Sequence, residues 1–262
     1  MVHAIEASGA KVLGADPLPG DDGVLQLMAQ GAAGEVLRGV IDRHLAPSDL
    51  LVADHLPQVP RVFVSDMDST MIGQECIDEL ADFAGLKEQI AGITERAMQG
   101  ELDFAEALNE RVRLLGGLGE DAIQQCLDER IRDMPGAAVL VATLKARGCE
   151  TVLVTGGFHQ FADPVAERLG FQRVVGNRLG TAHGKLTGSL VGDIVDSGVK
   201  ERVLRECVAA ADGAHSLATG DGANDIPMLV AAHYGVAYHA KPKARAAANG
   251  AVDRGDLTSV LR

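Results

Sequence analysis

The chain has 262 residues, of which 47% are hydrophobic and 23% charged, with 31 glycines and no tryptophan. This composition is typical of a globular protein rich in small residues and excludes the disordered and collagen-like classes. The formal net charge of -13 disfavours nonspecific binding to nucleic acid or to an anionic membrane surface, because the mean field of the protein repels polyanions.

No run of the sequence approaches the roughly 18 apolar residues that a membrane-spanning helix needs. The first residues, Met-Val-His-Ala-Ile-Glu, lack the basic and apolar regions of a secretion signal, so we expect a cytoplasmic protein. The cysteines lie far apart and form no Cys-x-x-Cys pair, which argues against a zinc knuckle or a redox motif. Reduced, mostly buried thiols are expected at Cys76, Cys126, Cys149 and Cys207.

Residues 1–58 contain no motif that indicates catalysis. An apolar stretch over residues 24–45 predicts a helix, and Leu-Leu-Val follows at 50–52. Pro57 and Pro60 then precede a run with the character of a buried strand, so we place a domain boundary there. We interpret the first 58 residues as a small α/β regulatory or dimerisation module, although about 60 residues is short for a complete regulatory domain.

The remainder, residues 59–262, begins with the β-rich run Arg-Val-Phe-Val-Ser at 61–65, which predicts a central strand that ends at Asp66. Residues 73–132 are rich in Glu, Leu, Ala and Arg and are interrupted by glycines, so they predict several helices inserted after that strand. Beyond them, strand and helix patterns alternate, which predicts a parallel sheet. The expected elements are a helix at 137–147, a strand at 151–154, a helix at 160–169, a hairpin within 174–191, a helix at 199–210 and a strand at 215–219.

Two carboxylates, Asp66 and Asp68, follow the first predicted strand. Open α/β sheets bind their ligands at the carboxyl ends of parallel strands. One carboxylate at such a place could attack phosphorus while the other transfers protons. An Asp-x-Asp pair alone is more often a turn or a helix cap, so the assignment depends on the motifs that accompany it.

Three further features occupy similar positions. Thr-Gly-Gly at 155–157 combines a hydroxyl with backbone amides that suit a phosphate oxygen. Lys200 supplies a cation near a predicted helix start, and Asp221 and Asp225 offer carboxylates for a hard metal ion. Each feature alone would more often be an ordinary turn or surface residue. Their combination favours a site that binds phosphate.

Together these motifs resemble the haloacid dehalogenase superfamily and, within it, the phosphoserine phosphatase family, over residues 61–255. The resemblance rests on Asp-Met-Asp-Ser-Thr-Met-Ile at 66–72, on the segments 75–80 and 98–104, and on Arg-Val at 111–112. It extends over most of the chain, which is far more than a chance match would cover.

The resemblance implies a fold and a movement. The fold is α/β: a Rossmann-like core with a parallel sheet, built from residues 59–72 and 135–262, with a small helical cap of about residues 73–134 inserted after the first strand. If the cap opens to admit substrate and closes to shield the phosphorylated enzyme from water, its motion gates turnover.

The resemblance also implies roles for the acidic residues. Asp66 would be the nucleophile that becomes an aspartyl-phosphate, and Asp68 would be the proton donor and general acid–base. Mg2+ would be bound by the Asp66 carboxylate, the backbone carbonyl of Asp68 and the Asp221 carboxylate. Asp225 would support the metal through its neighbours.

The phosphate group would be held by Thr155, Gly156 and Lys200. The family usually has serine at the position of Thr155, but either residue supplies one hydroxyl donor. The segment around Lys200 matches the family pattern more loosely than its surroundings, and Lys185 is the alternative cation.

The implied substrate is O-phospho-L-serine, which would be hydrolysed to L-serine and phosphate in L-serine biosynthesis. Glu75 would bind its ammonium group and Arg111 would bind its carboxylate. Asn224 would contact the substrate near the phosphate. Met98 and Phe104 would close the apolar side and exclude water.

Two other functions remain open at this stage. One is a related phosphatase or phosphotransferase that acts on another small phosphomonoester, such as phosphoethanolamine or phosphohomoserine. The other is a noncatalytic binding protein of the same fold, although such a protein need not keep the nucleophile, acid, lysine and metal aspartates together. We expect neither a nucleic acid nor a membrane partner, and residues 1–58 could form the contact of a homodimer.

Overall fold

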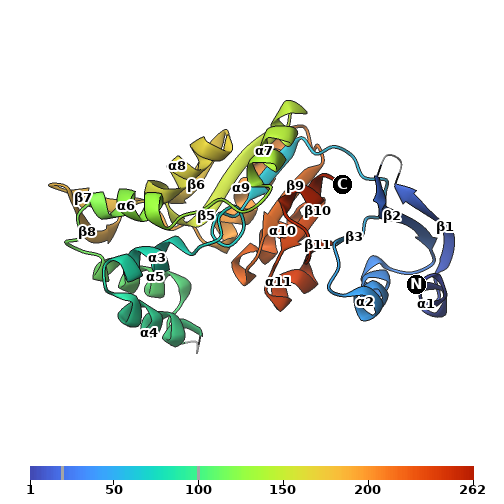
Figure 1. The fold of residues 1–262 in the computed structure, drawn as a ribbon, viewed down its shortest axis with the longest axis horizontal. Helices are drawn as coiled ribbons and strands as arrows, with labels where there is room; N and C mark the ends of the chain where they lie inside the picture. Colours follow the sequence, from blue (N-terminus) through green and yellow to red (C-terminus); the bar gives the residue numbers. More distant parts are fainter. Residues whose placement is uncertain (19–20, 99–100) are drawn as a thin grey trace.

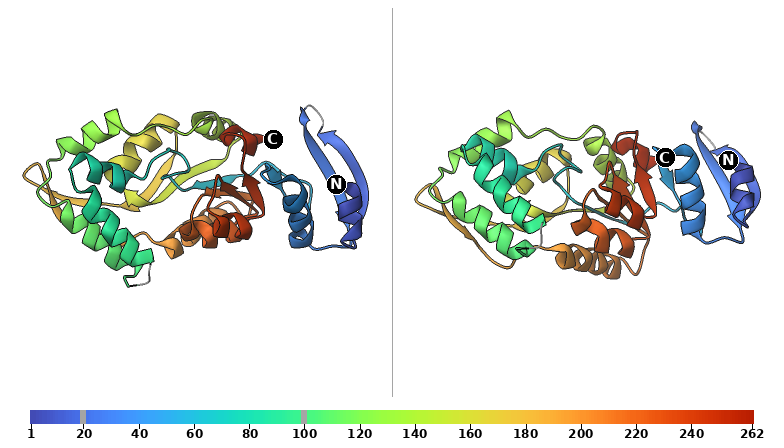
Figure 2. Two further views of the ribbon diagram at one scale, coloured as in Figure 1. Left: turned by 60° about the horizontal axis from the view of Figure 1, so that its bottom comes forward. Right: turned by 90° about the horizontal axis from the view of Figure 1, so that it is seen from below.

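The computed structural model describes residues 1–18, 21–98 and 101–262. The molecule is elongated, with an N-terminal unit at one end, an α/β core in the middle and a group of inserted helices at the other end (Figures 1 and 2). The N-terminal unit contains α1 (Val2–Ala7), β1 (Lys11–Leu18), β2 (Asp21–Gln30) and α2 (Gly34–Leu45). The inserted helices are α3 (Cys76–Phe83), α4 (Lys87–Met98), α5 (Phe104–Leu114) and α6 (Asp121–Glu129).

Among the residues that the structure describes, seven strands form the central sheet. These strands are β3 (Leu50–Leu51), β4 (Val62–Ser65), β5 (Glu150–Phe158), β6 (Arg173–Asn177), β9 (Ser216–Gly220), β10 (Tyr234–Tyr238) and β11 (Gly250–Val252). Their order is β3-β11-β10-β9-β4-β5-β6, and every neighbouring pair is parallel except β3 and β11. The chain runs outward from β4 first through β5 and β6 and later through β9, β10 and β11. The order therefore reverses beside β4, where doubly wound sheets have their ligand crevice.

Helices cover both faces of this sheet (Figure 1). On one face pack α7 (Ala137–Ala146) and α8 (His159–Leu169), and on the other pack α9 (Ser197–Ala210), α10 (Ile226–Ala231) and α11 (Pro242–Ala247). The remaining elements are the hairpin strands β7 (Leu179–Ala182) and β8 (Lys185–Leu190) and the short 3-10 helices η1 (Ala223–Asp225) and η2 (Leu257–Leu261).

Strand β4 is apolar along its length because both of its faces are covered. Val62 and Val64 pack in the cluster that contains α9 and α10, whereas Phe63 packs in the cluster that contains α7 and α8. Successive side chains of a strand point to opposite faces, so a strand covered on both sides needs a continuous apolar run. The strand predicted at 61–65 is confirmed, and it ends directly before Asp66.

The insertion predicted over residues 73–132 forms α3 to α6. Helix α5 begins with a capping box, in which the side chains of Asp103 and Glu106 each accept the other residue's backbone N–H. After α5, the N–H of Gly117 donates to the carbonyl oxygen of Leu186 in β8 over 2.8 Å. The β7–β8 hairpin of the core therefore supports the inserted helices.

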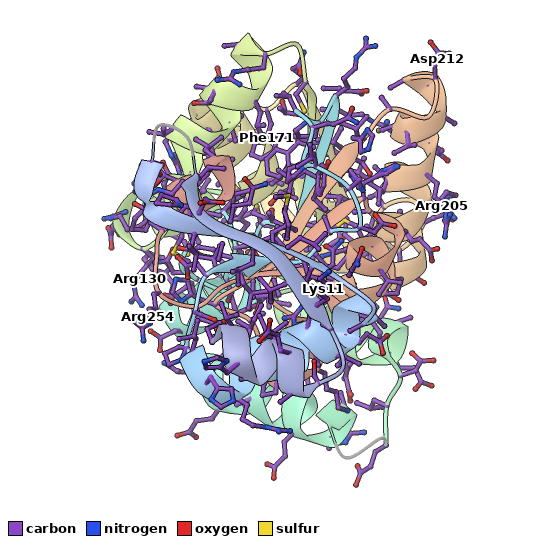
Figure 3. All side chains as sticks on the ribbon, turned by 90° about the vertical axis from the view of Figure 1, so that its right-hand side faces the viewer. Lys11, Arg130, Phe171, Arg205, Asp212 and Arg254 are labelled. Carbon is purple, nitrogen blue, oxygen red and sulfur yellow. The ribbon has the colours of Figure 1, made fainter. Side chains whose placement is uncertain are left out.

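The N-terminal unit is built on the antiparallel hairpin of β1 and β2, which Figure 3 views from the front, with Lys11 at the start of β1. The buried residues that join the hairpin to α1 and α2 are Ile5, Ala10 and Val40. Strand β3 carries the chain into the central sheet. The guanidinium of Arg245 in α11 donates to the Asp42 carboxylate in α2 over 2.8 Å, which attaches the unit to the core.

The helix predicted over residues 24–45 is wrong in its first part. Residues 24–30 lie in β2, and the helix begins only at Gly34. Gly31 has a φ of 91°, in the left-handed region, and this conformation ends the strand. The hydrogen-bonding partner of β2 is β1, and an apolar run does not reveal whether such a partner strand exists.

The hairpin predicted within 174–191 is correct only in its second half. Residues 179–190 form the β7–β8 hairpin, but β6 is a parallel strand of the central sheet and pairs with β5. Alternating apolar residues suit both kinds of strand, so the pattern alone could not separate them. The sequence patterns did not predict α10, β10, α11 or β11.

The described residues include no helix that is both long enough and apolar enough to cross a membrane. All four cysteines are free and buried, as expected. Burial raises the pKa of the Cys126 thiol to about 11 and that of Cys149 to about 12. These side chains are therefore protonated, unreactive thiols at neutral pH.

Gly235 in β10 gives a test of how closely α10 packs on the sheet. A Cβ at this position would overlap the backbone oxygen of Leu229. We expect Gly235→Ala to lower the free energy of unfolding by about 2–3 kcal/mol, measured by denaturant titration. Gly39→Ala in α2 is the control, since its Cβ would enter open space in the described structure, and a helical alanine stabilises by up to about 1 kcal/mol. Equal destabilisation by both changes would contradict the packing argument.

Candidate active site

Three strands of the core end side by side with polar residues. Asp66 directly follows β4, Asp221 directly follows β9, and Thr155 lies near the end of β5. Strands β5 and β9 are the two neighbours of β4 in the sheet. Because the three strands are parallel, their carboxyl ends meet at one edge, beside the point where the strand order reverses. Motifs that are far apart in the sequence are therefore neighbours in the fold.

Lys200 is the positive centre of this edge. Its side chain is 1% exposed, and its Nζ lies 2.6 Å from Asp66 Oδ1 and 2.7 Å from Asp225 Oδ1. Burial lowers the pKa of Lys200, but the two carboxylates outweigh that effect and hold the pKa above its usual value. The ammonium therefore stays charged. Lys185, the alternative in the sequence, is exposed at the start of β8.

The carboxylates outnumber this ammonium. Burial and then the charge of Asp225 raise the pKa of Asp66 well above its usual value, against the opposing effect of Lys200. Burial also raises the pKa of Asp221, although Lys241 opposes it. An excess of negative charge in a buried place is unfavourable unless a proton or a cation neutralises it.

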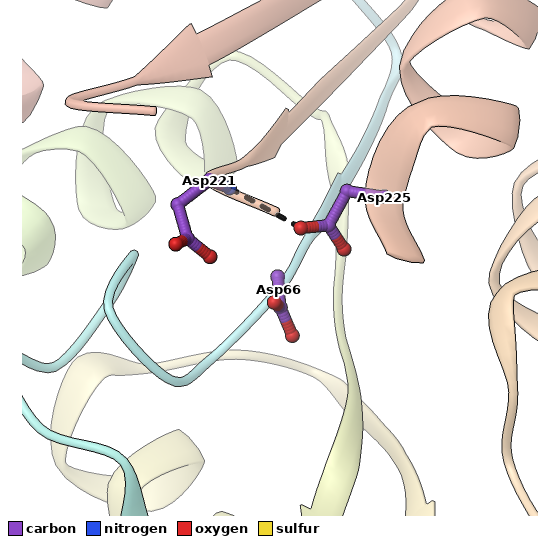
Figure 4. A group of neighbouring side chains, drawn as sticks. All are labelled: Asp66, Asp221 and Asp225. Carbon is purple, nitrogen blue, oxygen red and sulfur yellow. Dashed lines mark hydrogen bonds between the residues drawn. The ribbon is translucent and has the colours of Figure 1, made fainter. Parts of the chain in front are cut away.

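The same residues can hold a metal ion. Asp66, Asp221 and Asp225 are buried, and each offers an oxygen within 4.8 Å of the others' (Figure 4). Carboxylate oxygens suit a hard divalent cation, and the negative excess favours one. The Oδ2 atom of Asp225 accepts the N–H groups of Asp221 over 3.2 Å and of Gly222 over 3.0 Å. These contacts suit the supporting role that the sequence predicts for Asp225.

Asp68 lies two residues after Asp66 and is half-buried. Its carboxylate accepts the backbone N–H of Cys76 over 3.4 Å. Burial and then the charge of Glu75 raise the pKa of Asp68 to about 7. A carboxyl group with such a pKa can release and accept a proton near neutral pH, which is the property that general acid–base catalysis requires.

Thr155 lies in an irregular part of β5, where the pairing register with β6 shifts between Val154 and Phe158. The Oγ1 atom of Thr155 accepts the N–H of Gly157 over 2.8 Å, so the hydroxyl hydrogen is left to donate elsewhere. At Gly156, a Cβ would lie 3.4 Å from Cζ of the Phe104 ring. The first residue of α5 therefore lies against the β5 segment that the sequence predicts to bind phosphate.

Two groups of opposite charge come from the inserted segment. Glu75 precedes α3, and its Oε1 accepts a hydrogen bond from Ser69 Oγ over 2.8 Å. Arg111 lies on α5, where burial lowers its pKa while the charges of Asp78 and Glu75 raise it. Glu75 therefore interacts electrostatically both with Arg111 and with Asp68.

The remaining predicted residues are Asn224 and Met98. Asn224 is exposed in η1, between the two aspartates of its motif. Met98 ends α4, and its side chain lies outside the described part of the structure. The sequence patterns missed Lys241, whose Nζ lies 3.3 Å from Asp221 Oδ2. A search at the end of β10 would have found it, but that strand was not predicted.

The comparisons with known proteins agree with this fold. Residues 63–230 match the family model of the haloacid dehalogenase-like hydrolases, which places the chain in that class. The phosphoserine phosphatase of Albidiferax ferrireducens is 45% identical over 208 residues, which cover 77% of this chain and 88% of the relative. The chain therefore belongs to the phosphoserine phosphatase family of these hydrolases.

Solved structures give the same result. A probable phosphoserine phosphatase from Vibrio cholerae in its unliganded form superposes with a TM-score of 0.77 at 33% identity, covering 99% of this chain and 81% of that one. A phosphoserine phosphatase solved as a phospho-aspartyl intermediate analogue has a TM-score of 0.70 at 33% identity, covering 78% of this chain and 98% of that one. The predicted Rossmann-like core with a mostly parallel sheet is confirmed.

Asp68 makes the stability of the metal-free protein depend on pH. Its pKa is about 7 in the folded state and about 3.9 in an unfolded chain. Between these values the folded state keeps a proton that the unfolded chain has lost, so this contribution to stability falls as the pH rises from about 4 to about 7 and is lowest above that range.

Asp68→Asn removes this dependence. We therefore expect the melting temperature of Asp68→Asn minus that of the parent protein to be higher at pH 8 than at pH 5. Both proteins are measured by thermal unfolding in a chelator. Asp212→Asn, at an exposed turn after α9, is the control and should show the same difference at both pH values. An Asp68→Asn difference that does not change with pH would contradict the assignment.

Proposed function

We propose that this protein hydrolyses O-phospho-L-serine to L-serine and inorganic phosphate, a reaction of L-serine biosynthesis. The observation that carries the proposal is the contact of Asp66 with the buried Lys200 at the carboxyl end of β4. That contact occurs in a chain whose relatives are named phosphoserine phosphatase. It provides a carboxylate nucleophile beside a fixed cation for the phosphoryl group.

In the first step, an oxygen of Asp66 attacks phosphorus and the bond from phosphorus to the seryl oxygen breaks. We assign the attack to Oδ2, because Oδ1 accepts from both the Lys200 ammonium and the N–H of Met67. Asp68 gives its proton to the departing seryl oxygen, for which a pKa of about 7 is suited. The products of this step are L-serine and an aspartyl-phosphate.

In the second step, water attacks the phosphorus of the aspartyl-phosphate. Asp68, now a carboxylate, takes a proton from that water, and the bond between phosphorus and Asp66 breaks. Mg2+, bound by the carboxylates of Asp66 and Asp221 and the backbone carbonyl of Asp68, would supply the positive charge that neutralises the phosphoryl oxygens. Lys200, the Thr155 hydroxyl and Gly156 hold those oxygens throughout.

Selection of phosphoserine is assigned to the two charged groups of the inserted segment. Glu75 pairs with the substrate ammonium and Arg111 with the carboxylate, since a zwitterion is best held by one group of each sign. Asn224 lies beside the phosphate end. Phe104 forms part of the apolar cover, and the inserted helices act as the cap that closes over the substrate.

The remaining assignments are also proposals. We assign Mg2+ as the metal because the cluster presents carboxylate oxygens, which this ion prefers. The cytoplasm is the proposed location. We propose residues 1–58 as a regulatory or dimerisation module and residues 59–262 as the phosphatase domain, with a homodimer formed through the former.

Replacing the nucleophile tests the chemistry. We expect Asp66→Asn to lower kcat for phosphate release from L-phosphoserine by about 10³-fold or more, because an amide cannot form the phosphorylated intermediate. Phosphate release is measured colorimetrically in Mg2+, and circular dichroism verifies that the variant is folded. Asp212→Asn should retain full activity. An Asp66→Asn variant that releases phosphate at the parent rate would rule out Asp66 as the nucleophile.

Replacing Arg111 tests the substrate. Loss of a charge-assisted hydrogen bond of about 1.5–3 kcal/mol predicts that Arg111→Met raises KM for L-phosphoserine by about 10- to 100-fold. The rate on phosphoethanolamine, which has no carboxylate, should hardly change. Arg113→Met, at an exposed position of the same helix, is the matched control. Equal losses on both esters would show that Arg111 does not recognise the carboxylate.

A further inference from the structure

Asn177 is a buried polar residue to which the proposed mechanism gives no role. It is the last residue of β6, and it is 2% exposed. Its side chain joins two segments that are separate in the sequence. The amide Nδ2 donates to the carbonyl oxygen of Gly156 over 2.8 Å, and Oδ1 accepts the backbone N–H of Val195 over 2.9 Å.

The first of these bonds fixes one peptide group of the β5 segment that is proposed to bind phosphate. The carbonyl of Gly156 and the N–H of Gly157 belong to the same planar peptide unit. Asn177 holds the carbonyl end of this unit, while the N–H end donates to Thr155 Oγ1 over 2.8 Å. The orientation of the Thr155 hydroxyl therefore depends, through one rigid plane, on the amide of Asn177.

The second bond fixes the start of the helix that carries Lys200. Val195 directly precedes Asp196, the N-cap of α9, whose side chain accepts the N–H of Val199 over 2.9 Å. The carbonyl oxygen of Val195 would also lie 3.8 Å from a Cβ at Gly156. The start of α9 therefore lies close to Gly156 in β5, and Asn177 bonds to both segments.

We propose that Asn177 is a positioning residue that sets the distance between the Thr155–Gly156 segment of β5 and the start of α9. It holds the two groups of phosphate donors in one geometry without touching the substrate itself. This inference deepens the proposed function and rests on it for the identity of the substrate. What it adds concerns only the affinity of the site for the phosphate group.

The chain contains a matched residue with which a purely structural role can be compared. Asn249 also bridges two backbone groups, since its Nδ2 donates to the carbonyl of His233 and its Oδ1 accepts the N–H of Gly235, each over 2.8 Å. It lies before β11, and its partners lie at the start of β10. These positions are at the amino ends of the parallel strands, whereas the site lies at the carboxyl ends. Loss of Asn249 therefore removes a similar pair of hydrogen bonds at a place where no phosphate is bound.

The experiment measures binding of inorganic phosphate to the full chain in Mg2+ by titration calorimetry, together with KM and kcat for L-phosphoserine. Asn177→Ala should weaken phosphate binding by about tenfold or more, the effect of one hydrogen bond to a fixed donor. Asn177→Asp should weaken it at least as much, because a carboxylate can accept from Val195 but cannot donate to Gly156. Asn249→Ala should bind phosphate within about twofold of the parent.

Each outcome bears on the inference separately from the proposed function. Parent-like phosphate affinity in Asn177→Asp would overturn it, as would equal weakening in Asn249→Ala or a parent protein that binds no phosphate. If Asn177→Ala does not fold, the near-isosteric Asn177→Asp decides the question alone. If the parent releases no phosphate from L-phosphoserine while the Asn177 variants still lose phosphate affinity, the proposed function fails and the positioning role stands.

Discussion

The arrangement of the site depends on one buried ammonium group. Lys200 is almost completely removed from water and lies within 2.7 Å of carboxylate oxygens of both Asp66 and Asp225. Removing a charge from water costs several kcal/mol unless partners compensate, and a partner that is displaced leaves the other charges unpaired. The end of β4, the start of α9 and the turn after β9 are therefore held in a single relative position.

The same pairing leaves the site short of positive charge. The buried aspartates outnumber Lys200, so the carboxyl ends of these strands favour a bound cation. Burial and the nearby Glu75 also raise the pKa of Asp68 into the neutral range. The capacity to bind a metal ion and the raised pKa of Asp68 thus follow from one electrostatic environment.

The core holds the parts that surround this edge through backbone contacts. The β8 strand of the hairpin bonds to the turn after α5, and β3 adds the N-terminal unit to the sheet beside β11. In addition to these backbone contacts, the side chain of Asn177 connects Gly156 in β5 to the start of α9. Side chains from separate segments of the chain are in this way attached to one scaffold.

The sequence by itself determined the features that depend on local chemistry. The apolar run before Asp66 predicted a buried strand, the alternation of strand and helix patterns predicted the parallel sheet, and the polar residues after strand ends indicated where the site lies. The sequence did not determine which strands pair. Residues 24–30 form a strand that pairs with β1, and β6 joins the central sheet by pairing with β5. Only the tertiary structure revealed the contacts of Lys241 and Asn177, since a hydrogen bond or ion pair between distant segments is decided by packing and leaves no pattern in the order of residues.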